Sequence, residues 1–412
     1  MSEASCIPIP PIPSTLVDPS IVENPHPVLA LLRKHEPLFW DPVIRAWVAT
    51  RYEDVKAIFS DRRFSRDRTL SSRYVPPPGD SWAYKIDHDT TTRSSGEEHT
   101  RWRKRISAGF TPRAVRRMES QVREVVEQFA APLRGRRGTV DLIARFTNPI
   151  PNTVISRITG IPPYPGEEDR FRCLAQDVIR RFFPMADEEN VQRGEQAIGE
   201  LAEWVDKLAD QRRREPANDL LSDLITGNLG DDSMSNDEIV MLITVLVAAG
   251  SETTTLGGTR AIELLLEHPG QAAKLREDPG LIENAIREVL RFGFGSTVGG
   301  TPRVAMEDVE LRGKKIEKGQ SVMLSTTSAN RDEAVFDDPD RFDVTRDTRD
   351  MLSFGSGPHY CLGANLAMQE MSCMVEAALD FLPQDATLVE AARKTETIGI
   401  MHRPVTLPVD FG

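Results

Sequence analysis

One stretch of ten residues, Phe354–Gly363, places a thiol, an imidazole and three glycines in a single tight loop. Its glycines can approach other groups closely or take positive φ, which suits a loop that wraps around a ligand. Apolar residues at helical spacing begin directly after Cys361. We therefore expect its sulfur at a helix N-terminus, where the helix dipole and free N–H groups favour a thiolate. The pattern predicts a loop that holds a large planar ligand; the alternative is a buried free cysteine beside a glycine turn.

The longest predicted helix begins just after residue 235. Ser235 and Glu238 form a capping-box pattern, apolar residues then continue on all faces, and a His-Pro-Gly sequence at 268–270 ends the pattern. We therefore expect a buried helix about 45 to 50 Å long.

Within this helix, a carboxylate and a hydroxyl interrupt the apolar surface at Glu252 and Thr253. The Thr253 hydroxyl can donate to the Ala249 carbonyl one turn back, and Gly250 weakens the helix, so we expect the helix to open locally. A buried carboxylate usually has a partner or a functional task, and Glu252 could supply a proton route. The alternative is a structural Glu252 paired with an arginine.

The order aromatic, Gly, x, Gly, x, basic, x, Cys, x, Gly in residues 354–363 resembles the cysteine loop of the cytochrome P450 family. The pair of Glu252 and Thr253 is similar to the acid-alcohol pair of that family, with Glu where many relatives carry Asp. The resemblance implies a mainly α fold with small β-sheets, a triangular helical prism in which haem b lies between the long central helix and the helix of the cysteine loop. It also implies that Cys361 ligates the haem iron through a thiolate, which favours O–O cleavage. Glu252 and Thr253 would then manage proton delivery, and the further haem contacts implied are Ala249, Phe354, Gly355 and Gly363.

Four cations are assigned to the two haem propionates by the same resemblance. His99 and Arg103 stand at i and i+4, so they share one face of a helix. Arg303 and His359 complete this group of cofactor-binding residues, and charge-assisted hydrogen bonds would hold the propionates.

An acid and a base at Glu288 and Arg291 share one helix face, a spacing that any surface helix can show. The resemblance makes this segment the Glu-x-x-Arg helix of the family and adds Arg346 as the third member of a buried structural ion network. Such pairs often add little net stability yet are costly to break.

The substrate pocket is placed by resemblance alone. Its expected lining is apolar or soft and consists of Val245, Ala248, Val298, Ile400 and Met401. This lining suggests a hydrophobic small-molecule substrate such as a terpenoid, a steroid, a fatty acid or an aromatic compound. The segments before His99 and after Arg291 lack prolines that are usual in relatives, so the pocket shape around residues 71–98 and 292–302 does not follow from the resemblance.

The implied reaction inserts one oxygen atom of dioxygen into a C–H or C=C bond and reduces the other to water. We find no G-x-G-x-x-G motif, so we expect electrons from an external ferredoxin and an NAD(P)H-dependent ferredoxin reductase. A basic cluster is either a solvated helix face or the dock for an acidic partner. Its members are Arg101, Arg103, Lys104, Arg105, Arg113, Arg116 and Arg117. By the resemblance, we expect an acidic ferredoxin to dock on its part from Arg101 to Arg105. A peroxide-driven haem peroxygenase, a haem-thiolate sensor or binding protein without turnover, and an unrelated helical protein are the alternatives.

The remaining pattern predicts the elements that position these residues. We expect a short helix at 27–34, strands at 37–40 and 46–50, a helix at 52–59, a loop at 71–98, helices at 99–128, 191–214 and 281–291, and strands at 309–311 and 321–324 paired as a hairpin. Residues 1–20 are expected to be a proline-rich tail and residues 21–412 a single domain.

Bulk composition argues against other classes. A net charge of −12 argues against nucleic acid as the main partner. The longest apolar run is shorter than the roughly twenty residues that cross a bilayer, so we expect no membrane anchor. The four cysteines form no C-x-x-C pair, which suits a reducing cytoplasm. We expect a cytoplasmic monomer.

Overall fold

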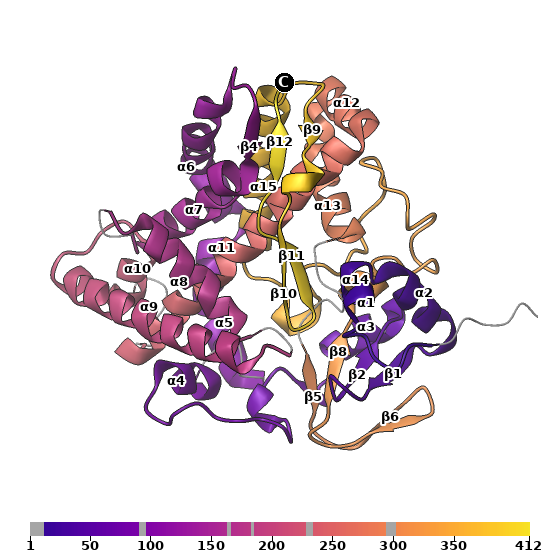
Figure 1. The fold of residues 1–412 in the computed structure, drawn as a ribbon. Helices are drawn as coiled ribbons and strands as arrows, with labels where there is room; N and C mark the ends of the chain where they lie inside the picture. The colour runs from indigo at the N-terminus through magenta and orange to yellow at the C-terminus, as the bar shows by residue number, and fades with distance from the viewer. Residues whose placement is uncertain (1–11, 90–95, 163–165, 183–184, 228–233, 294–301) are drawn as a thin grey trace, which may run out of the picture.

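The computed structural model describes residues 12–89, 96–162, 166–182, 185–227, 234–293 and 302–412. Helix α11 (Asn236–Glu267), 32 residues long, runs through the middle of the molecule (Figure 1). The Glu238 N–H donates to the Ser235 hydroxyl at 3.2 Å, and the Ser235 N–H donates to the Glu238 carboxylate at 2.7 Å. The predicted capping box and the predicted long helix are therefore confirmed.

Helix α11 is the one helix in the described ranges that is long and apolar enough to cross a membrane by length and composition. Of its most apolar window, 72% is buried inside the protein. Helices α7 (Pro149–Thr159), α8 (Glu168–Arg180), α9 (Glu188–Arg214) and α15 (Ala364–Phe381) pack around it. Its apolarity is accounted for by this packing.

The other helices surround this group or cover the sheets (Figure 1). They are α1 (Pro19–Glu23), α2 (His26–His35), α3 (Tyr52–Ser60), α4 (Trp82–Asp89), α5 (Gly96–Ser107), α6 (Pro112–Ala130), α10 (Leu220–Thr226), α12 (Pro269–Glu277), α13 (Ile282–Phe292) and α14 (Thr326–Ala329).

The described residues form four small sheets. The largest has the order β1-β2-β8-β5-β3, with β2 and β8 parallel and the other neighbours antiparallel. Its strands are β1 (Leu38–Asp41), β2 (Ala46–Ala49), β3 (Phe64–Ser65), β5 (Arg303–Ala305) and β8 (Ser321–Leu324). The smaller sheets contain β4 (Thr139–Asp141), β9 (Thr387–Leu388) and β12 (Pro408–Asp410); β6 (Val309–Leu311) and β7 (Lys314–Ile316); and β10 (Thr395–Ile398) and β11 (Met401–Pro404).

Three predicted elements were wrong. The loop expected at 71–98 contains α4 and the start of α5. The single helix expected at 99–128 is two helices, because Thr111 caps a new helix whose first residue is Pro112. Strand 309–311 pairs with β7, whereas β8 joins β2 and β5 in the large sheet. Local turn signals around residues 312–319 therefore indicated strands correctly but did not select the partner.

The N-terminal segment is also more ordered than a tail. Leu16 is fully buried, and its N–H donates to the Asp41 carboxylate at 2.7 Å. The Thr15 hydroxyl donates to the same carboxylate at 3.0 Å. The boundary predicted at residue 20 therefore lies too late, because this segment docks on β1; residues 1–11 lie outside the described residues.

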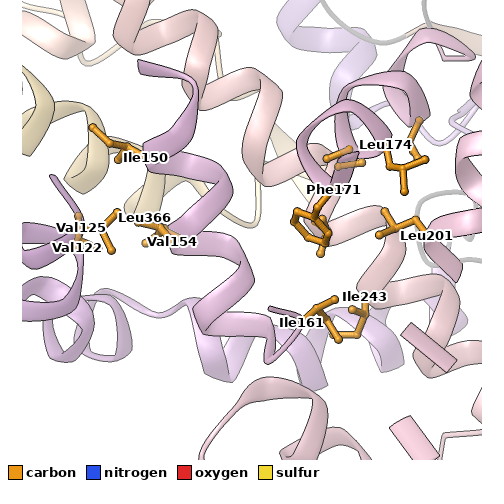
Figure 2. Packing of buried hydrophobic residues seen from close by; sticks show 14 of the residues in the cluster. Val122, Val125, Ile150, Val154, Ile161, Phe171, Leu174, Leu201, Ile243 and Leu366 are labelled. Atoms are coloured by element: carbon orange, nitrogen blue, oxygen red, sulfur yellow. The ribbon is translucent and has the colours of Figure 1, made fainter. Parts of the chain in front are cut away.

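Buried hydrophobic side chains hold together the helices that carry the candidate site. Figure 2 shows two neighbouring groups in this core, on either side of the central helices. One group comes from α6, α7 and α15, and the other comes from α8, α9, α11 and Ile161. The labelled residues are Val122, Val125, Ile150, Val154, Leu366, Phe171, Leu174, Leu201, Ile161 and Ile243. Each such side chain contributes about 1.5–3 kcal/mol when fully buried, so α11 and α15 are fixed relative to each other.

Candidate functional site

The cysteine loop packs closely against α3, and its glycines allow this close approach. Gly355 and Gly357 have φ values of 72° and 70°, in the left-handed region that favours glycine. A Cβ on Gly357 would lie 2.6 Å from the Ser60 hydroxyl and 3.1 Å from the Phe59 carbonyl oxygen. The Cys361 N–H donates to the Phe354 carbonyl at 2.9 Å, which closes the loop. These contacts fix the position of the Cys361 sulfur just before α15.

The Cys361 side chain is accessible, but the surrounding protein still removes part of its hydration. This desolvation raises the pKa of the thiol. A hydrogen bond from the Gly363 N–H and the charges of Arg103 and Arg66 lower it and offset part of this increase. The predicted free N–H is present, because the Gly363 N–H favours the thiolate just before α15 begins at Ala364, but burial opposes it and raises the pKa. A metal cation at the sulfur would displace the proton, since metals bind the thiolate.

Basic side chains from several elements gather beside this sulfur. The rings of His99 and His359 have their centroids 4.1 Å apart, and the Arg103 guanidinium donates to the Tyr360 carbonyl, one residue before the cysteine. Arg303, at the start of β5, is 2% exposed, and its pKa is lowered to about 9 by burial and by Arg66. The pKa of His359 is lowered to about 2, chiefly by burial and then by the neighbouring cations.

Arg66 is a fifth basic residue in this group, and it was not among the predicted site residues. It follows β3 directly, and the register that pairs Ser65 with Val304 brings it beside Arg303. Burial lowers the pKa of Arg66. The charge of Cys361 raises this pKa, whereas the charge of Arg103 lowers it further. No local motif marks Arg66; only the pairing of strands about 240 residues apart places it here.

These residues fit the haem implied by the sequence. The thiol supplies the soft ligand, and the cations supply donors for two carboxylates. Within the described part of the chain, neither Arg66 nor Arg103 forms an ion pair with a carboxylate. A Cβ on Gly363 would meet no protein atom within 4 Å, so packing against protein does not require a glycine there. A planar ligand beside the sulfur gives that glycine a reason.

One stripe of the central helix is accessible although its neighbours are buried. Ala249 and Thr253, at i and i+4, are exposed, whereas Ala248, Ser251 and Glu252 are buried. The Thr253 hydroxyl donates to the Ala249 carbonyl at 2.7 Å, which confirms that predicted hydrogen bond.

The expected local opening of this helix is absent, because α11 is continuous from Asn236 to Glu267. A Cβ on Gly250 would lie 3.0 Å from the Ile155 side chain. Gly250 therefore allows close packing of α7 on α11.

The Glu252 carboxylate pairs with an arginine of the β10–β11 hairpin. It is 3% exposed, and its Oε1 pairs with the guanidinium of Arg403 on β11. Its Oε2 is buried and has no hydrogen-bond partner among the residues that the structure describes. Successive helix residues differ in direction by about 100°, so Glu252 and Thr253 do not point the same way. The arginine pairing considered as the structural alternative is therefore present, and one carboxylate oxygen is left for a proton or a water.

The predicted ion network is observed. Arg291 Nε donates to Glu288 Oε2 at 2.6 Å and Arg291 Nη2 donates to Glu288 Oε1 at 2.9 Å, with both side chains fully buried. Arg346 Nε donates to the same Oε1 at 3.1 Å. Arg291 Nη1 also donates to the carbonyls of Asn330 and Pro339, each at 2.9 Å. The network therefore ties α13 to the segment that leads to the cysteine loop.

The predicted lining residues are not all in comparable positions. Val245 and Met401 are half-buried. Ala248 and Ile400 are each 1% exposed and belong to hydrophobic clusters, that of Ile400 including Leu16 of the N-terminal segment. Both residues therefore belong to the core in this structure. Ala248 is part of the helical core, and Ile400 is part of the cluster that includes Leu16 of the N-terminal segment. Val298 lies outside the described residues.

The basic cluster divides into inward and outward members. Arg103 points to the cysteine loop, and Arg101 lies 3.7 Å from Glu238 at the start of α11. Lys104 and the α6 residues of the cluster are exposed. We call Arg113, Arg116 and Arg117 the α6 basic patch. The side chain of Arg105 lies outside the described residues.

The chain has a mainly helical fold, a cysteine loop beside basic side chains, and an accessible stripe on a buried central helix. This combination is the arrangement expected of a haem-thiolate protein. Residues 39–401 match the family described as Cytochrome P450. The chain belongs to the cytochrome P450 family, and this membership implies a haem cofactor. The predicted family and fold are thereby confirmed.

Its similarity to individual proteins extends over most of the chain. It is 35% identical to Nocardicin C N-oxygenase of Nocardia uniformis subsp. tsuyamanensis, covering 89% of each chain. It is 36% identical to 6-deoxyerythronolide B hydroxylase of Saccharopolyspora erythraea, covering 88% of this chain and 90% of that one. The structure of epothilone B-bound cytochrome P450epoK superposes with a TM-score of 0.87 at 30% identity, covering 96% of this chain and 98% of that one.

Proposed function

We propose that this cytochrome P450 monooxygenase inserts one oxygen atom of dioxygen into a hydrophobic small molecule, with electrons from an external ferredoxin and its NAD(P)H-dependent reductase. The observation that carries the proposal is the Cys361 sulfur, fixed in a closed loop and flanked by cations on three separate segments. A hydroxylase is among the similar proteins, which supports oxygen insertion as the reaction.

The residues around the sulfur are assigned to the cofactor, which we propose to be haem b. Cys361 is the iron ligand, and Phe354, Gly355 and Gly363 shape the loop beside it. His99, Arg103, Arg303 and His359 hold the two propionates, and Arg66 joins them. When bound, such a haem supplies dioxygen activation, and the thiolate favours O–O cleavage. Burial of the cations favours this role, because a buried positive charge gains from an anionic partner.

The central helix supplies the proton-handling groups in this proposal. Thr253 presents its hydroxyl on the accessible stripe, where Ala249 leaves room for a flat ligand. Glu252 lies one residue earlier with one unpartnered oxygen, so it can take up a proton that arrives from solvent and pass it on. Arg403 pairs with the other oxygen of this carboxylate.

A hydrophobic substrate is favoured by the apolar or soft predicted lining residues that are half-buried, Val245 and Met401. We propose a terpenoid, a steroid, a fatty acid or an aromatic compound. Nocardicin C N-oxygenase and 6-deoxyerythronolide B hydroxylase carry the names of two different substrates, so similarity at this level does not choose among these classes.

The redox partner is assigned to the exposed basic residues near the cysteine loop. In a chain of net charge −12, Lys104 and the α6 basic patch form a local positive surface. Such a surface suits an acidic ferredoxin, because complementary charge speeds docking. We place the protein in the cytoplasm as a single-domain monomer; the free thiols at Cys173, Cys361 and Cys373 suit a reducing compartment.

The decisive experiment is the absorption spectrum of the reduced, carbon-monoxide-treated protein. The wild-type protein should show the red-shifted band typical of a thiolate ligand, and Cys361→His should bind haem without it. Cys173→Ser, which changes an exposed cysteine on α8, is the matched control and should keep the band. A wild-type protein that never shows the band after reconstitution with haemin would overturn the proposal. Turnover with hydrogen peroxide alone, and none with ferredoxin, would replace it with a peroxygenase.

A further inference from the structure

A chain of alternating charges begins at Glu252 and leaves the central helix. Glu252 pairs with Arg403, and Arg403 Nε donates to Glu396 Oε1 at 2.7 Å. Arg403 and Glu396 are directly opposite each other in the β10–β11 hairpin. The hairpin therefore supplies the first two links beyond α11.

The chain continues into α8 and α9. Arg180, the last residue of α8, donates to the two oxygens of Glu396 at 3.2 and 3.3 Å and to Asp177 Oδ1 at 2.8 Å. The other oxygen of Asp177 accepts from Arg193 Nε of α9 at 2.8 Å. The exposed fraction of the side chains rises from 3% at Glu252 to 52% at Arg193. Six side chains thus connect the core of α11 with the surface of α9.

Each inner member of this chain is shared between two neighbours, and two of them lie on the hairpin. Glu396 serves both Arg403 and Arg180, and Arg403 serves both Glu396 and Glu252. When α8 moves away from the hairpin, Glu396 keeps only Arg403 and draws it away from Glu252. Among the described residues Glu252 Oε2 has no hydrogen-bond partner, so within this part of the chain Arg403 is the contact that fixes the carboxylate.

We propose that the β10–β11 hairpin couples the position of α8 and α9 to the orientation of the Glu252 carboxylate, with Arg403 as the positioning residue. Arg403 holds the carboxylate on the hairpin while α8 is seated, and displacement of α8 releases it for proton transfer. The functional part of this inference rests on the proposed role of Glu252 in proton delivery. The mechanical part rests on the ion pairs alone.

Coupling between two sites is reciprocal, so it can be tested in the reverse direction without turnover. Glu252→Gln removes the carboxylate that pairs with Arg403 on the α11 side. Arg403 should then bind Glu396 more strongly, which weakens the ion pair between Glu396 and Arg180 of α8. Hydrogen exchange measured by mass spectrometry on the haem-loaded protein should show faster exchange at the C-terminal end of α8 and the start of α9, by about fivefold or more. In an Arg403→Met background the same Glu252→Gln change should add nothing.

Glu263→Gln is the matched control. Glu263 is also a buried acid of α11, but it pairs with Arg260 and Arg393 and has no link to the hairpin chain. It should leave exchange in α8 and α9 unchanged. Equal effects of the two glutamine variants, or no effect of Glu252→Gln, would overturn the coupling.

A second measurement follows the released carboxylate. Arg180→Met should lower the hydrogen peroxide released per NADPH consumed with a surrogate ferredoxin and reductase, and Arg180→Lys should restore the wild-type value. A purely structural role of Arg180 predicts no change in this ratio, so an unchanged ratio contradicts the inference even if Glu252→Gln fails to fold. The carbon monoxide spectrum separates the two hypotheses: a normal band with unchanged exchange rejects the coupling alone, and an absent band rejects the proposed function.

Discussion

Replacement of Arg291 by Met is expected to destabilise the protein by about 3–5 kcal/mol, the usual result of breaking a buried ion pair. Arg291 and Glu288 are both fully buried, and the guanidinium makes two hydrogen bonds to the carboxylate, at 2.6 and 2.9 Å. Without Arg291, Glu288 keeps one charged partner, Arg346, at 3.1 Å. The carboxylate would then be a buried charge with about half of its compensation.

The same substitution also leaves main-chain groups without a donor. The carbonyls of Asn330 and Pro339 each accept from Arg291 at 2.9 Å, and each buried acceptor left unsatisfied costs about 1–3 kcal/mol. These losses overlap, so they are not added to the ion-pair loss. Against a typical total stability of about 5–15 kcal/mol, the expected change is a large fraction.

Urea unfolding followed by circular dichroism measures this change, and haem content of the purified protein measures its effect on the site. Arg287→Met is the matched control on the same helix. Arg287 pairs with Glu283 at 3.0 Å, but both side chains are exposed, so the control should lose no more than about 1 kcal/mol. Arg291→Lys keeps the charge but loses the two-pronged geometry, and should lie between the two. Similar losses for Arg291→Met and Arg287→Met would refute the reasoning.

Three further predictions concern the cofactor, the partner surface and pH. Arg66→Gln should release haem to excess apomyoglobin about tenfold faster, because it loses one charge-assisted hydrogen bond. Arg63→Gln, which changes an exposed neighbour, should not change this rate. Equal release rates for the two variants would show that Arg66 is not part of the site. Reversing the charges of the α6 basic patch should slow reduction by an acidic ferredoxin, most at low salt, and leave thermal stability nearly unchanged; a rate independent of both charge and salt would contradict docking there. Burial raises the pKa of Glu370 well above its usual value, so the fold favours the protonated carboxyl and this group costs stability once pH exceeds the unfolded value of about 4.3. Glu370→Gln should therefore stabilise the protein at pH 7 and lose that gain as the pH falls towards about 4, whereas Glu376→Gln, which removes an exposed ion pair, should give no such gain.

The parts of the site that lie within one short segment could be predicted from the sequence. The cysteine loop depends on glycines whose positive φ is a local property, and positive φ is observed at Gly355 and Gly357. The capping box at Ser235 and the hydrogen bond of Thr253 to Ala249 are also local, because they join residues three or four apart. Helix α11 followed from an apolar pattern that no exposed helix would carry.

Errors arose where a partner distant in sequence decides the outcome. Two strands near residue 310 were found, but their pairing depends on which edge of which sheet lies nearby. The N-terminal segment looked like a tail because nothing within it shows that Asp41 accepts hydrogen bonds from Leu16. Ile400 was expected in the pocket, but this same segment covers it.

The sequence by itself determined the chemistry: one cysteine in a glycine-pinned loop, a carboxylate and a hydroxyl in an apolar helix, and an acid and a base that share one helix face. Tertiary structure alone decided which charges meet when they are distant in the sequence. Strand register brought Arg66 beside Arg303, and the hairpin carried Arg403 to Glu252. The physical reason is that hydrogen bonds within a loop or helix turn are set by neighbours in the chain, whereas an ion pair requires only proximity in space, which the packing of the whole core provides.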